Sequence, residues 1–305
     1  MDDIEQAVGL LRQGALVALP TETVYGLGAD ALNPAAVAKI FSAKGRPSDH
    51  PLIVHLADAA QLIDWAREIP REAIALARAF WPGPLTLILK KEEGVPDLVT
   101  GGQDTVGLRV PNHPVALALL RAFGGGIAAP SANRFGRISP TTAEHVRQEL
   151  GDRVALILEG GACQVGLEST ILDLSRGVPV ILRPGAIGVE DIARVIGRRP
   201  RLRGEVSSDR PDDAPRVSGA LAAHYAPRTP LMLLPYEAIA SRLEVGDAVL
   251  ARCPAPPHLP DGVLWEQAPA DPAGYGHDLY ARLRSLDASS ARRILVEAPA
   301  AGAEW

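Results

Sequence analysis

Lys44-Gly45-Arg46-Pro47-Ser48-Asp49-His50-Pro51-Leu52 joins a helical run to an apolar strand and places two fixed cations and a histidine at the join. A second polar island, Pro130-Ser131-Ala132-Asn133, follows an apolar segment rich in glycine, residues 124–129. Two such islands suggest one shared cleft suited to an anion. A basic turn at a helix end is, by itself, more often a solvated cap than a phosphate ligand. Only the two polar islands together therefore indicate an anion site.

The segments around this stretch alternate between helix and strand. Helices are predicted near residues 34–43, 59–66, 71–80, 114–123, 141–149 and 189–196, and strands near 15–19, 52–56, 85–89, 105–110, 154–158, 170–172 and 180–182. Gly and Pro turns bound these strands without a regular strand-helix repeat. The first 200 residues therefore predict an α/β domain with a twisted mixed sheet and flanking helices.

A change in composition follows Pro200. Residues 204–214 hold Ser, Asp and Pro and almost nothing apolar, which is typical of a linker. Short strands near 231–234, 248–250 and 294–296 and a helix near 278–286 come next. We expect a domain at residues 1–200, a linker at 201–229, and a small Rossmann-like α/β domain at 230–305.

Composition narrows the class of protein. With 305 residues and 47% hydrophobic content, the chain can bury a substantial core, and its net charge of -5 disfavours non-specific nucleic-acid binding as the main activity. Its two cysteines, Cys163 and Cys253, support neither a disulfide framework nor a zinc site. The acidic amino terminus is unlike a signal peptide, and no apolar run approaches the roughly 20 residues of a membrane span. A cytoplasmic protein is expected.

Several nucleotide and hydrolase motifs are missing or out of place. Residues 26–31, Gly-Leu-Gly-Ala-Asp-Ala, match the dinucleotide fingerprint formally. The preceding strand is predicted to end near Leu19 and the next helix to begin near Asn33, so the required tight turn is absent. The chain has no Walker loop and no G-x-S-x-G elbow. If the protein handles a nucleotide, it uses another cradle.

Polar residues at strand ends are the candidate ligands. Thr21 and Thr23 follow the first strand, where open α/β sheets place ligand groups, although either could simply cap a turn. Arg109 lies within an apolar strand and would suit a carboxylate, whereas an outward position or an internal salt bridge would also explain it. Ser169 and Arg183, also at strand ends, could face the same cleft.

Eight ordered motifs, taken together, resemble the threonylcarbamoyl-AMP synthase family. They are Pro20-Thr21-Glu22-Thr23-Val24-Tyr25-Gly26-Leu27-Gly28, Lys44-Gly45-Arg46-Pro47, His50-Pro51-Leu52-Ile53-Val54-His55, Trp81-Pro82-Gly83-Pro84-Leu85-Thr86, Arg109-Val110-Pro111, Pro130-Ser131-Ala132-Asn133, Glu168-Ser169-Thr170 and Arg183-Pro184-Gly185. His224-Tyr225-Ala226-Pro227 is similar to the segment that folds over the active site in the family's long form. The resemblance implies a YrdC-like catalytic domain, with residues 201–229 as linker and active-site lid.

The resemblance also implies an activity and a set of site residues. An ATP-dependent nucleotidyltransferase would form L-threonylcarbamoyladenylate and pyrophosphate from L-threonine, bicarbonate and ATP, with Mg²⁺ accompanying ATP and no metal held by protein side chains. The product would feed threonylcarbamoyladenosine modification of tRNA beside the anticodon, through a possible downstream transferase. The implied catalytic residues are Lys44 and Arg46. The threonine ligands would be Thr23, His55, Arg109, Ala129 and Ser169, and the ATP ligands Arg46, His50, Thr105, Ser131, Asn133, Ser139, Arg183 and Tyr225.

Two other functions remain open at this point. An RNA-binding protein with a YrdC-like fold and no turnover is one, and a carbamoyl-transfer enzyme of another pathway that shares the catalytic domain is the other. The chain departs from the long form at residues 216–223, where Arg-Val-Ser-Gly-Ala-Leu-Ala-Ala replaces a more basic run. Contacts between the lid and the ligands are therefore the least defined part of the expected site.

Overall fold

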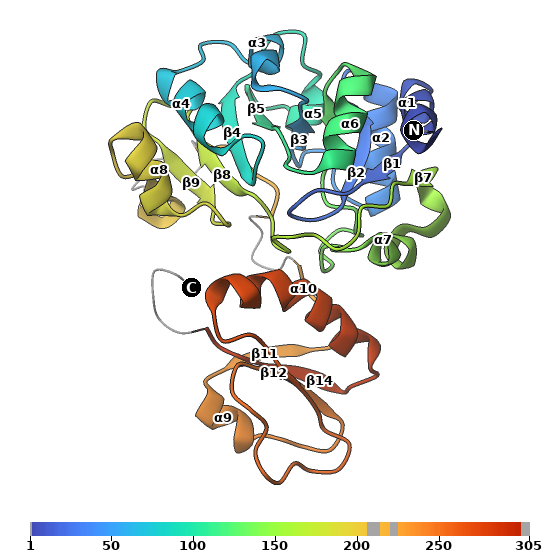
Figure 1. The fold of residues 1–305 in the computed structure, drawn as a ribbon, viewed down its shortest axis with the longest axis vertical. Coiled ribbons are helices and arrows are strands. Elements are labelled where there is room, and N and C mark those ends of the chain that lie inside the picture. Colours follow the sequence, from blue (N-terminus) through green and yellow to red (C-terminus); the bar gives the residue numbers. More distant parts are fainter. Residues whose placement is uncertain (1, 206–213, 220–224, 300–305) are drawn as a thin grey trace.

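The computed structural model describes residues 2–205, 214–219 and 225–299, which form two α/β units, each built around its own sheet (Figure 1). The large sheet runs in the order β10-β9-β8-β4-β5-β3-β6-β2-β1-β7, and the small one in the order β11-β14-β12-β13. Parallel and antiparallel pairs mix in the large sheet, whereas the described pairs of the small sheet are all parallel. The predicted fold class is confirmed.

The large unit contains most of the elements. Its strands are β1 (Val17–Leu19), β2 (Gly26–Asp30), β3 (Ile53–His55), β4 (Leu85–Lys90), β5 (Thr105–Arg109), β6 (Ile127–Ala128), β7 (Leu156–Ile157), β8 (Thr170–Asp173), β9 (Val180–Arg183) and β10 (Arg201–Leu202). Its α-helices are α1 (Asp2–Arg12), α2 (Pro34–Lys44), α3 (Leu62–Trp65), α4 (Arg71–Phe80), α5 (Asp97–Thr100), α6 (Pro114–Phe123), α7 (Ala143–Leu150) and α8 (Val189–Ile196).

The small unit follows with β11 (Leu231–Leu234), α9 (Tyr236–Ala240), β12 (Asp247–Ala251), β13 (Leu264–Gln267), α10 (Pro272–Ala288) and β14 (Arg293–Glu297). Helix α10 is longer than predicted because Asp271 caps it, accepting a hydrogen bond from the Gly274 amide, and because Pro272 starts it. Figure 1 shows α10 on the side of the small sheet that faces the large unit. No described helix combines the length and apolar character needed to cross a membrane.

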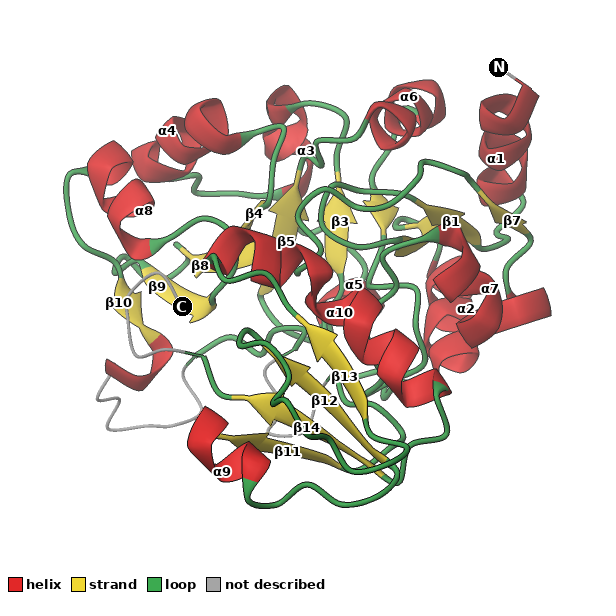
Figure 2. Cartoon of the chain, turned by 60° about the horizontal axis from the view of Figure 1, so that its bottom comes forward, coloured by secondary structure: helices red, strands yellow, loops and turns green. Residues whose placement is uncertain are grey.

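Helices cover both faces of the large sheet (Figure 2). Along β1, Val17 and Leu19 pack into the same cluster as α1 and α6, whereas Ala18 packs into the cluster that contains α2. This alternation follows from the two-residue period of a strand, which sends successive side chains to opposite faces. The sheet is therefore an internal layer in which inward-facing polar groups need partners.

The same alternation places polar side chains on one face of the central strands. Val54 of β3 and Leu108 of β5 enter the main core, whereas their neighbours His55 and Arg109 point to the opposite face. Thr86 of β4 lies on that face too, bonded to the Ser169 hydroxyl at 2.8 Å. The polar face of β3, β4 and β5 forms the floor of the site described below.

A register shift brings Arg183 to that face. Strand β9 pairs Ile181 with Leu172 and Arg183 with Ile171, so Leu182 is an extra residue and the strand is bulged. Ile181 packs into the main core, whereas Leu182 packs with Ile171 on the other side. An extra residue in a strand changes which face the following side chain reaches. Arg183 therefore follows Leu182 onto the polar face.

Strand β2 was not predicted from the sequence. Gly26–Asp30 lacks β-branched and aromatic residues, yet it pairs with β1 and β6. Gly28 is required there, because a Cβ would lie 2.9 Å from Leu19 Cδ2 and 3.0 Å from Ile127 Cγ2. The glycines of residues 26–31 thus allow close packing of strands. This agrees with the sequence analysis, which rejected their match to the dinucleotide fingerprint.

The segment predicted as linker, residues 201–229, is only partly described. Residues 206–213 and 220–224 lie outside the described part, and with them His224 of the motif His224-Tyr225-Ala226-Pro227. Residues 201–202 form β10 at the edge of the large sheet. Residues 214–219 and 225–229 run beside the large unit, where the Ala226 amide donates to the Gly136 carbonyl at 2.8 Å. The end of the predicted C-terminal domain, residues 300–305, also lies outside the description.

Candidate functional site

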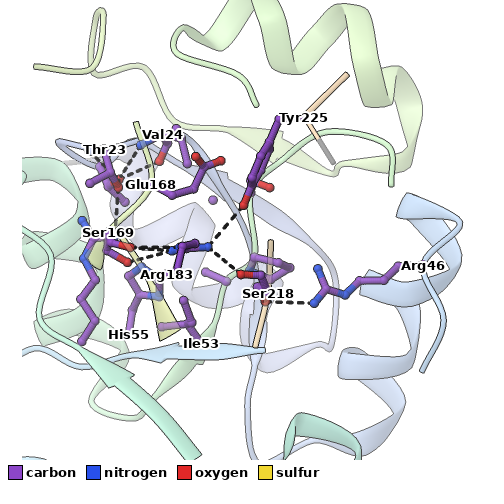
Figure 3. A pocket seen from close by; sticks show the side chains of 16 residues that line it. Thr23, Val24, Arg46, Ile53, His55, Glu168, Ser169, Arg183, Ser218 and Tyr225 are labelled. Atoms are coloured by element: carbon purple, nitrogen blue, oxygen red, sulfur yellow. Dashed lines mark hydrogen bonds between the residues drawn. The ribbon is translucent and has the colours of Figure 1, made fainter. Parts of the chain in front are cut away.

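A cavity of about 40 Å³ opens on the polar face of the large sheet (Figure 3). Its walls come from the loop after β1, from β2, β3 and β5, from the loop after β6, from the segments around β8 and β9, and from residues 218 and 225. The lining residues are Thr21, Thr23, Val24, Gly26, Arg46, Ile53, His55, Arg109, Ala129, Pro130, Ser131, Glu168, Ser169, Arg183, Ser218 and Tyr225. The two polar islands of the sequence, around Arg46 and Ser131, therefore do share one cleft.

Arg109 is held on three sides. Its Nε donates to the Gly83 carbonyl at 3.1 Å and its Nη1 to the Thr23 hydroxyl at 2.9 Å. Its Nη2 lies 2.7 Å from Glu22 Oε1, and both side chains of this ion pair are almost fully buried. The internal salt bridge considered from the sequence is therefore present, and the guanidinium still lines the cavity. With five N–H groups, the guanidinium has donors left for a ligand.

His55 lies beside Arg109 as a neutral imidazole. Burial, and then the positive charge of Arg109, lower the pKa of His55 to about 3. At neutral pH the ring adds no charge to the cavity. It can therefore accept or donate a hydrogen bond without repelling a nearby ammonium group.

Arg46 enters the cavity from the end of α2. The helix stops at Lys44 because Gly45 adopts the left-handed conformation, with a φ of 63°, and this turn directs Arg46 inward. Arg46 Nη2 donates to the Ser218 hydroxyl and to the Pro51 carbonyl, both at 2.9 Å. Burial lowers the pKa of Arg46 to about 10, so the guanidinium stays positive at neutral pH.

Arg183 forms a second buried cation on the opposite wall. Its Nη2 donates to the Ser169 hydroxyl at 3.1 Å and its Nη1 to the Ser218 carbonyl at 3.0 Å and to the Tyr225 hydroxyl at 3.3 Å. Figure 3 shows Arg183 among these three partners, with Arg46 reaching Ser218 from the other side. Ser218 thus bridges two guanidinium groups that would otherwise repel each other.

Lys44 does not line the cavity. Its amine donates to the Asn133 carbonyl at 2.6 Å and to the Ser131 carbonyl, so it fastens the second polar island to the end of α2. Burial, and then the neighbouring Arg46, lower the pKa of Lys44 well below its usual value. From the sequence, Lys44 was expected to contact a bound anion. In the structure Lys44 is 3% exposed, and its amine is hydrogen-bonded to backbone carbonyls.

The other predicted site residues fall into two groups. Thr23, Arg46, His55, Arg109, Ala129, Ser131, Ser169, Arg183 and Tyr225 line the cavity. His50, Thr105, Asn133 and Ser139 do not. Thr105 lines a neighbouring cavity that shares Ile53 and Ser218 with the first, and His50 packs edge-on against Phe135. Asn133 donates to the Arg134 and Arg137 carbonyls.

Three contacts at the cavity were not predicted from the sequence. Glu22 balances Arg109, Ser218 bridges the two arginines, and Glu168 accepts a hydrogen bond from Ser139 at 2.5 Å. Glu22 and Glu168 both occur in motifs quoted above, so a search for a buried partner of Arg109 could have drawn attention to Glu22. Ser218 lies where the chain departs from the long form, and no local signal marked it.

The site is therefore a cavity whose buried cations and hydroxyl groups suit an anion. Arg46, Arg109 and Arg183 are each less than 9% exposed and converge on a small volume. Within the described residues, no group of three or more His, Cys, Asp or Glu side chains could hold a metal ion. Such an arrangement can bind carboxylate and phosphate groups and stabilise negative charge that develops between them.

Comparison with known proteins agrees with this chemistry. Residues 9–185 match the family described as "Telomere recombination" (Sua5, YciO and YrdC), and residues 187–305 match "Threonylcarbamoyl-AMP synthase, C-terminal domain". The chain is 49% identical to the threonylcarbamoyl-AMP synthase of Pyrococcus abyssi over 76% of this chain and 67% of that one. Against the Bacillus subtilis synthase, the identity is 51% over 75% and 66% of the two chains. The chain thus spans about two thirds of these curated relatives.

Solved structures show the same likeness. The crystal structure of P. abyssi Sua5 complexed with L-threonine matches with a TM-score of 0.87 and 40% identity, over 97% of this chain and 89% of that one. Escherichia coli YciO matches with a TM-score of 0.55 and 29% identity, over 62% of this chain and 92% of its own. The second match thus covers a smaller part of this chain than the first.

Proposed function

The chain belongs to the threonylcarbamoyl-AMP synthase family, and from this premise we propose that it forms L-threonylcarbamoyladenylate and pyrophosphate from L-threonine, bicarbonate and ATP. The protein is then an ATP-dependent nucleotidyltransferase whose product serves threonylcarbamoyladenosine modification of tRNA. The observation that carries the proposal is the convergence of three buried guanidinium groups, those of Arg46, Arg109 and Arg183, on one hydroxyl-lined cavity.

L-Threonine would occupy the Arg109 end of the cavity. Its carboxylate suits the remaining N–H donors of Arg109, and the Thr23 and Ser169 hydroxyls suit its side-chain hydroxyl. Neutral His55 and the backbone at Ala129 complete this end. Support comes from the matched P. abyssi protein, which was crystallised with L-threonine.

ATP would lie across the other end, where Arg46, Ser131, Arg183 and Tyr225 line the wall. His50, Thr105, Asn133 and Ser139, the other residues assigned to ATP, lie outside the cavity. Thr105 is reached through the adjoining cavity, which shares Ile53 and Ser218 with the first. A nucleotide that extends from one cavity into the other would contact both walls.

The reaction needs positioning and charge stabilisation and no covalent enzyme intermediate. The threonine amine and bicarbonate give a carbamate and water. A carbamate oxygen then attacks the α-phosphorus, and the bond to the oxygen that bridges to the β-phosphate breaks as pyrophosphate leaves. Two anions must approach each other in this step. Arg46 and Arg183 are placed to offset that repulsion, and Lys44 would act through the loop it holds.

The cavity must enlarge before substrates enter. Its volume of about 40 Å³ is far below the roughly 300–1,000 Å³ of ligand pockets. Ser218 and Tyr225, which close one side through Arg46 and Arg183, are the groups best placed to move. Because the carbamoyl adenylate is labile to water, their return would protect the intermediate. Within the predicted lid, residues 201–229, the segments 214–219 and 225–229 would therefore be the ones that close over the active site.

Mg²⁺ would arrive with ATP. It binds phosphate oxygens and water readily and needs few protein carboxylates, which fits a described site without an acidic cluster. When bound, it would neutralise part of the phosphate charge. The protein residues that face the phosphates would still be Arg46 and Arg183.

The remaining proposals concern the setting of the reaction. We place the enzyme in the cytoplasm, with a downstream transferase that consumes the adenylate. We also propose the domain division of residues 1–200, 201–229 and 230–305. An RNA-binding protein without turnover is not favoured, because the buried arginines face a small cavity rather than an open surface.

Pyrophosphate release tests the proposed reaction directly. The protein is incubated with ATP, L-threonine and bicarbonate, each omitted in turn, and the adenylate is trapped and identified by mass spectrometry. Release that requires all three substrates, with a threonylcarbamoyl adenylate mass, is expected. Absence of release in every combination would contradict the proposal and would favour the RNA-binding alternative.

A further inference from the structure

Glu168 is a buried carboxylate on the wall of the cavity that none of the assigned roles explains. It is 8% exposed, and its two oxygens receive hydrogen bonds from different parts of the chain. Ser139 donates to Oε1 at 2.5 Å, and Tyr280 of α10 donates to Oε2 at 2.6 Å. A residue of the small unit therefore takes part in the polar lining of a cavity in the large unit.

Tyr280 also contacts the cavity by a second route. Its ring lies 5.8 Å from the ring of Tyr225, tilted by 36°, and the Tyr225 hydroxyl accepts a hydrogen bond from Arg183. Burial, and then the charge of Glu168, raise the pKa of Tyr280 well above its usual value, so the phenol keeps its proton and remains a donor. One side chain thus supports both a carboxylate and an arginine of the site.

Helix α10 is fastened to the loops that carry these groups. Gly166 lies so close to it that a Cβ would be 2.2 Å from the His277 carbonyl oxygen, and a Cβ on Gly276 would be 2.9 Å from Leu167 Cδ1. Arg284 Nε donates to the Ser139 carbonyl at 3.2 Å, and its Nη1 lies 3.3 Å from Glu149. The segments before Glu168 and around Ser139 are therefore both held by the same helix.

We propose that the small C-terminal unit is a working part of the nucleotide site, in which Tyr280 is a positioning residue that holds Glu168 and, through it, the Ser139 hydroxyl. Ser139 is fully buried and lies outside the cavity, so its hydroxyl is the second anchor of Glu168, the carboxylate that lines the wall. Loss of the Tyr280 hydroxyl would leave Glu168 with one donor and free it to turn toward the neighbouring cations. This inference rests on the proposed function, because Ser139, Arg183 and Tyr225 are assigned there to ATP.

Tyr280→Phe tests the role with the smallest possible change. It removes one hydroxyl and keeps the ring that packs on Tyr225. We expect kcat/KM for ATP to fall by about 10-fold to 100-fold, the scale of a misplaced reacting group, while the KM for L-threonine changes by less than about threefold. The matched control is Tyr236→Phe in the same unit, which is expected to behave as the wild type. Among the described residues, the Tyr236 hydroxyl donates to the Pro254 carbonyl, at 3.3 Å, and does not reach the cavity.

A double-mutant cycle identifies the route. If Tyr280 acts through Glu168, the Tyr280→Phe/Glu168→Gln double variant should lose no more activity than Glu168→Gln alone. Additive losses would overturn that route. A Tyr280→Phe variant with wild-type kinetics would overturn the proposal, as would a fall in melting temperature with equal losses toward both substrates, which is the result of a purely structural role.

Calorimetric titration with ATP alone keeps this test separate from the proposed reaction. A wild-type protein that makes no adenylate, yet binds ATP about tenfold more tightly than Tyr280→Phe, would refute the reaction and support the positioning role. A wild-type protein that makes adenylate and binds ATP no better than Tyr280→Phe, with equal kcat/KM values for the two proteins, would support the reaction and refute the role.

Discussion

Glu22 is expected to carry a large share of the stability of the ten-stranded unit, because it neutralises a guanidinium that water barely reaches. Its Oε1 lies 2.7 Å from Arg109 Nη2, and the two side chains are 3% and 4% exposed. Glu22→Ala would leave Arg109 charged and buried with only the Thr23 and Gly83 oxygens as partners. Breaking a buried pair in this way costs about 3–5 kcal/mol.

That loss translates into a shift in melting temperature. For a unit of this size, each kcal/mol changes Tm by about 2–4 °C, so Glu22→Ala should lower it by about 6–20 °C. Differential scanning calorimetry of the full chain measures the shift. Added L-threonine should recover part of it, because the substrate carboxylate would supply the missing negative charge.

A surface pair provides the control for this prediction. Glu68 lies 2.5 Å from Lys90, but its side chain is 57% exposed, so Glu68→Ala should leave Tm nearly unchanged. Equal shifts for Glu22→Ala and Glu68→Ala would refute the reasoning, since they would mean that burial of the Arg109 charge has no energetic consequence.

Three further predictions concern the site. Lys44→Ala should reduce adenylate formation far more than ATP binding, because its charge and the loop it holds matter most as the phosphate is attacked; equal losses in turnover and in calorimetric ATP affinity would contradict this. Acid should destabilise the protein through His55: the folded-state pKa of about 3 lies below the usual 6.5, so below about pH 6.5 the unfolded chain takes up a proton that the folded chain refuses. His55→Gln should therefore flatten the fall of Tm between pH 6.5 and 4, and an unchanged slope would exclude His55 as a cause. Excess EDTA should abolish pyrophosphate release and excess Mg²⁺ should restore it; turnover that survives EDTA would remove Mg²⁺ from the proposal.

Regular elements with strong local signals were predictable from the sequence. The predicted helices at 114–123 and 189–196 and the strand at 231–234 have the same bounds in the structure, because a proline or glycine marks an end of each helix and an apolar run marks the strand. Strand β2 was missed because nothing in its five residues favours a strand locally. It forms because β1 and β6 lie on either side of it and Gly28 lets them approach.

The sequence predicted which arginines and hydroxyl groups form the candidate site, but it did not predict the side chains that hydrogen-bond to them. Sequence motifs pointed to Arg46, Arg109 and Arg183, and all three line one cavity. The partners that hold them come from distant positions: Ser218 meets Arg46 across 172 residues, and Tyr280 meets Glu168 across 112. Nothing in the sequence around Tyr280 shows that its hydroxyl reaches another unit. Lys44 shows the reverse case, since a cation in a motif that the sequence singled out is bound to backbone carbonyls.

The bulge in β9 decides which changes of length that strand tolerates. Ile181 and Arg183 pair with consecutive residues of β8, Leu172 and Ile171, so Leu182 is the one unpaired residue between them. Deleting Leu182 would leave Arg183 directly after Ile181, and regular alternation would keep the guanidinium on the cavity side. A strand that kept Leu182 but lost the bulge would instead turn Arg183 toward the aliphatic side chains around Ile181. Active relatives can therefore lack the residue at Leu182, whereas a strand that keeps it needs the bulge.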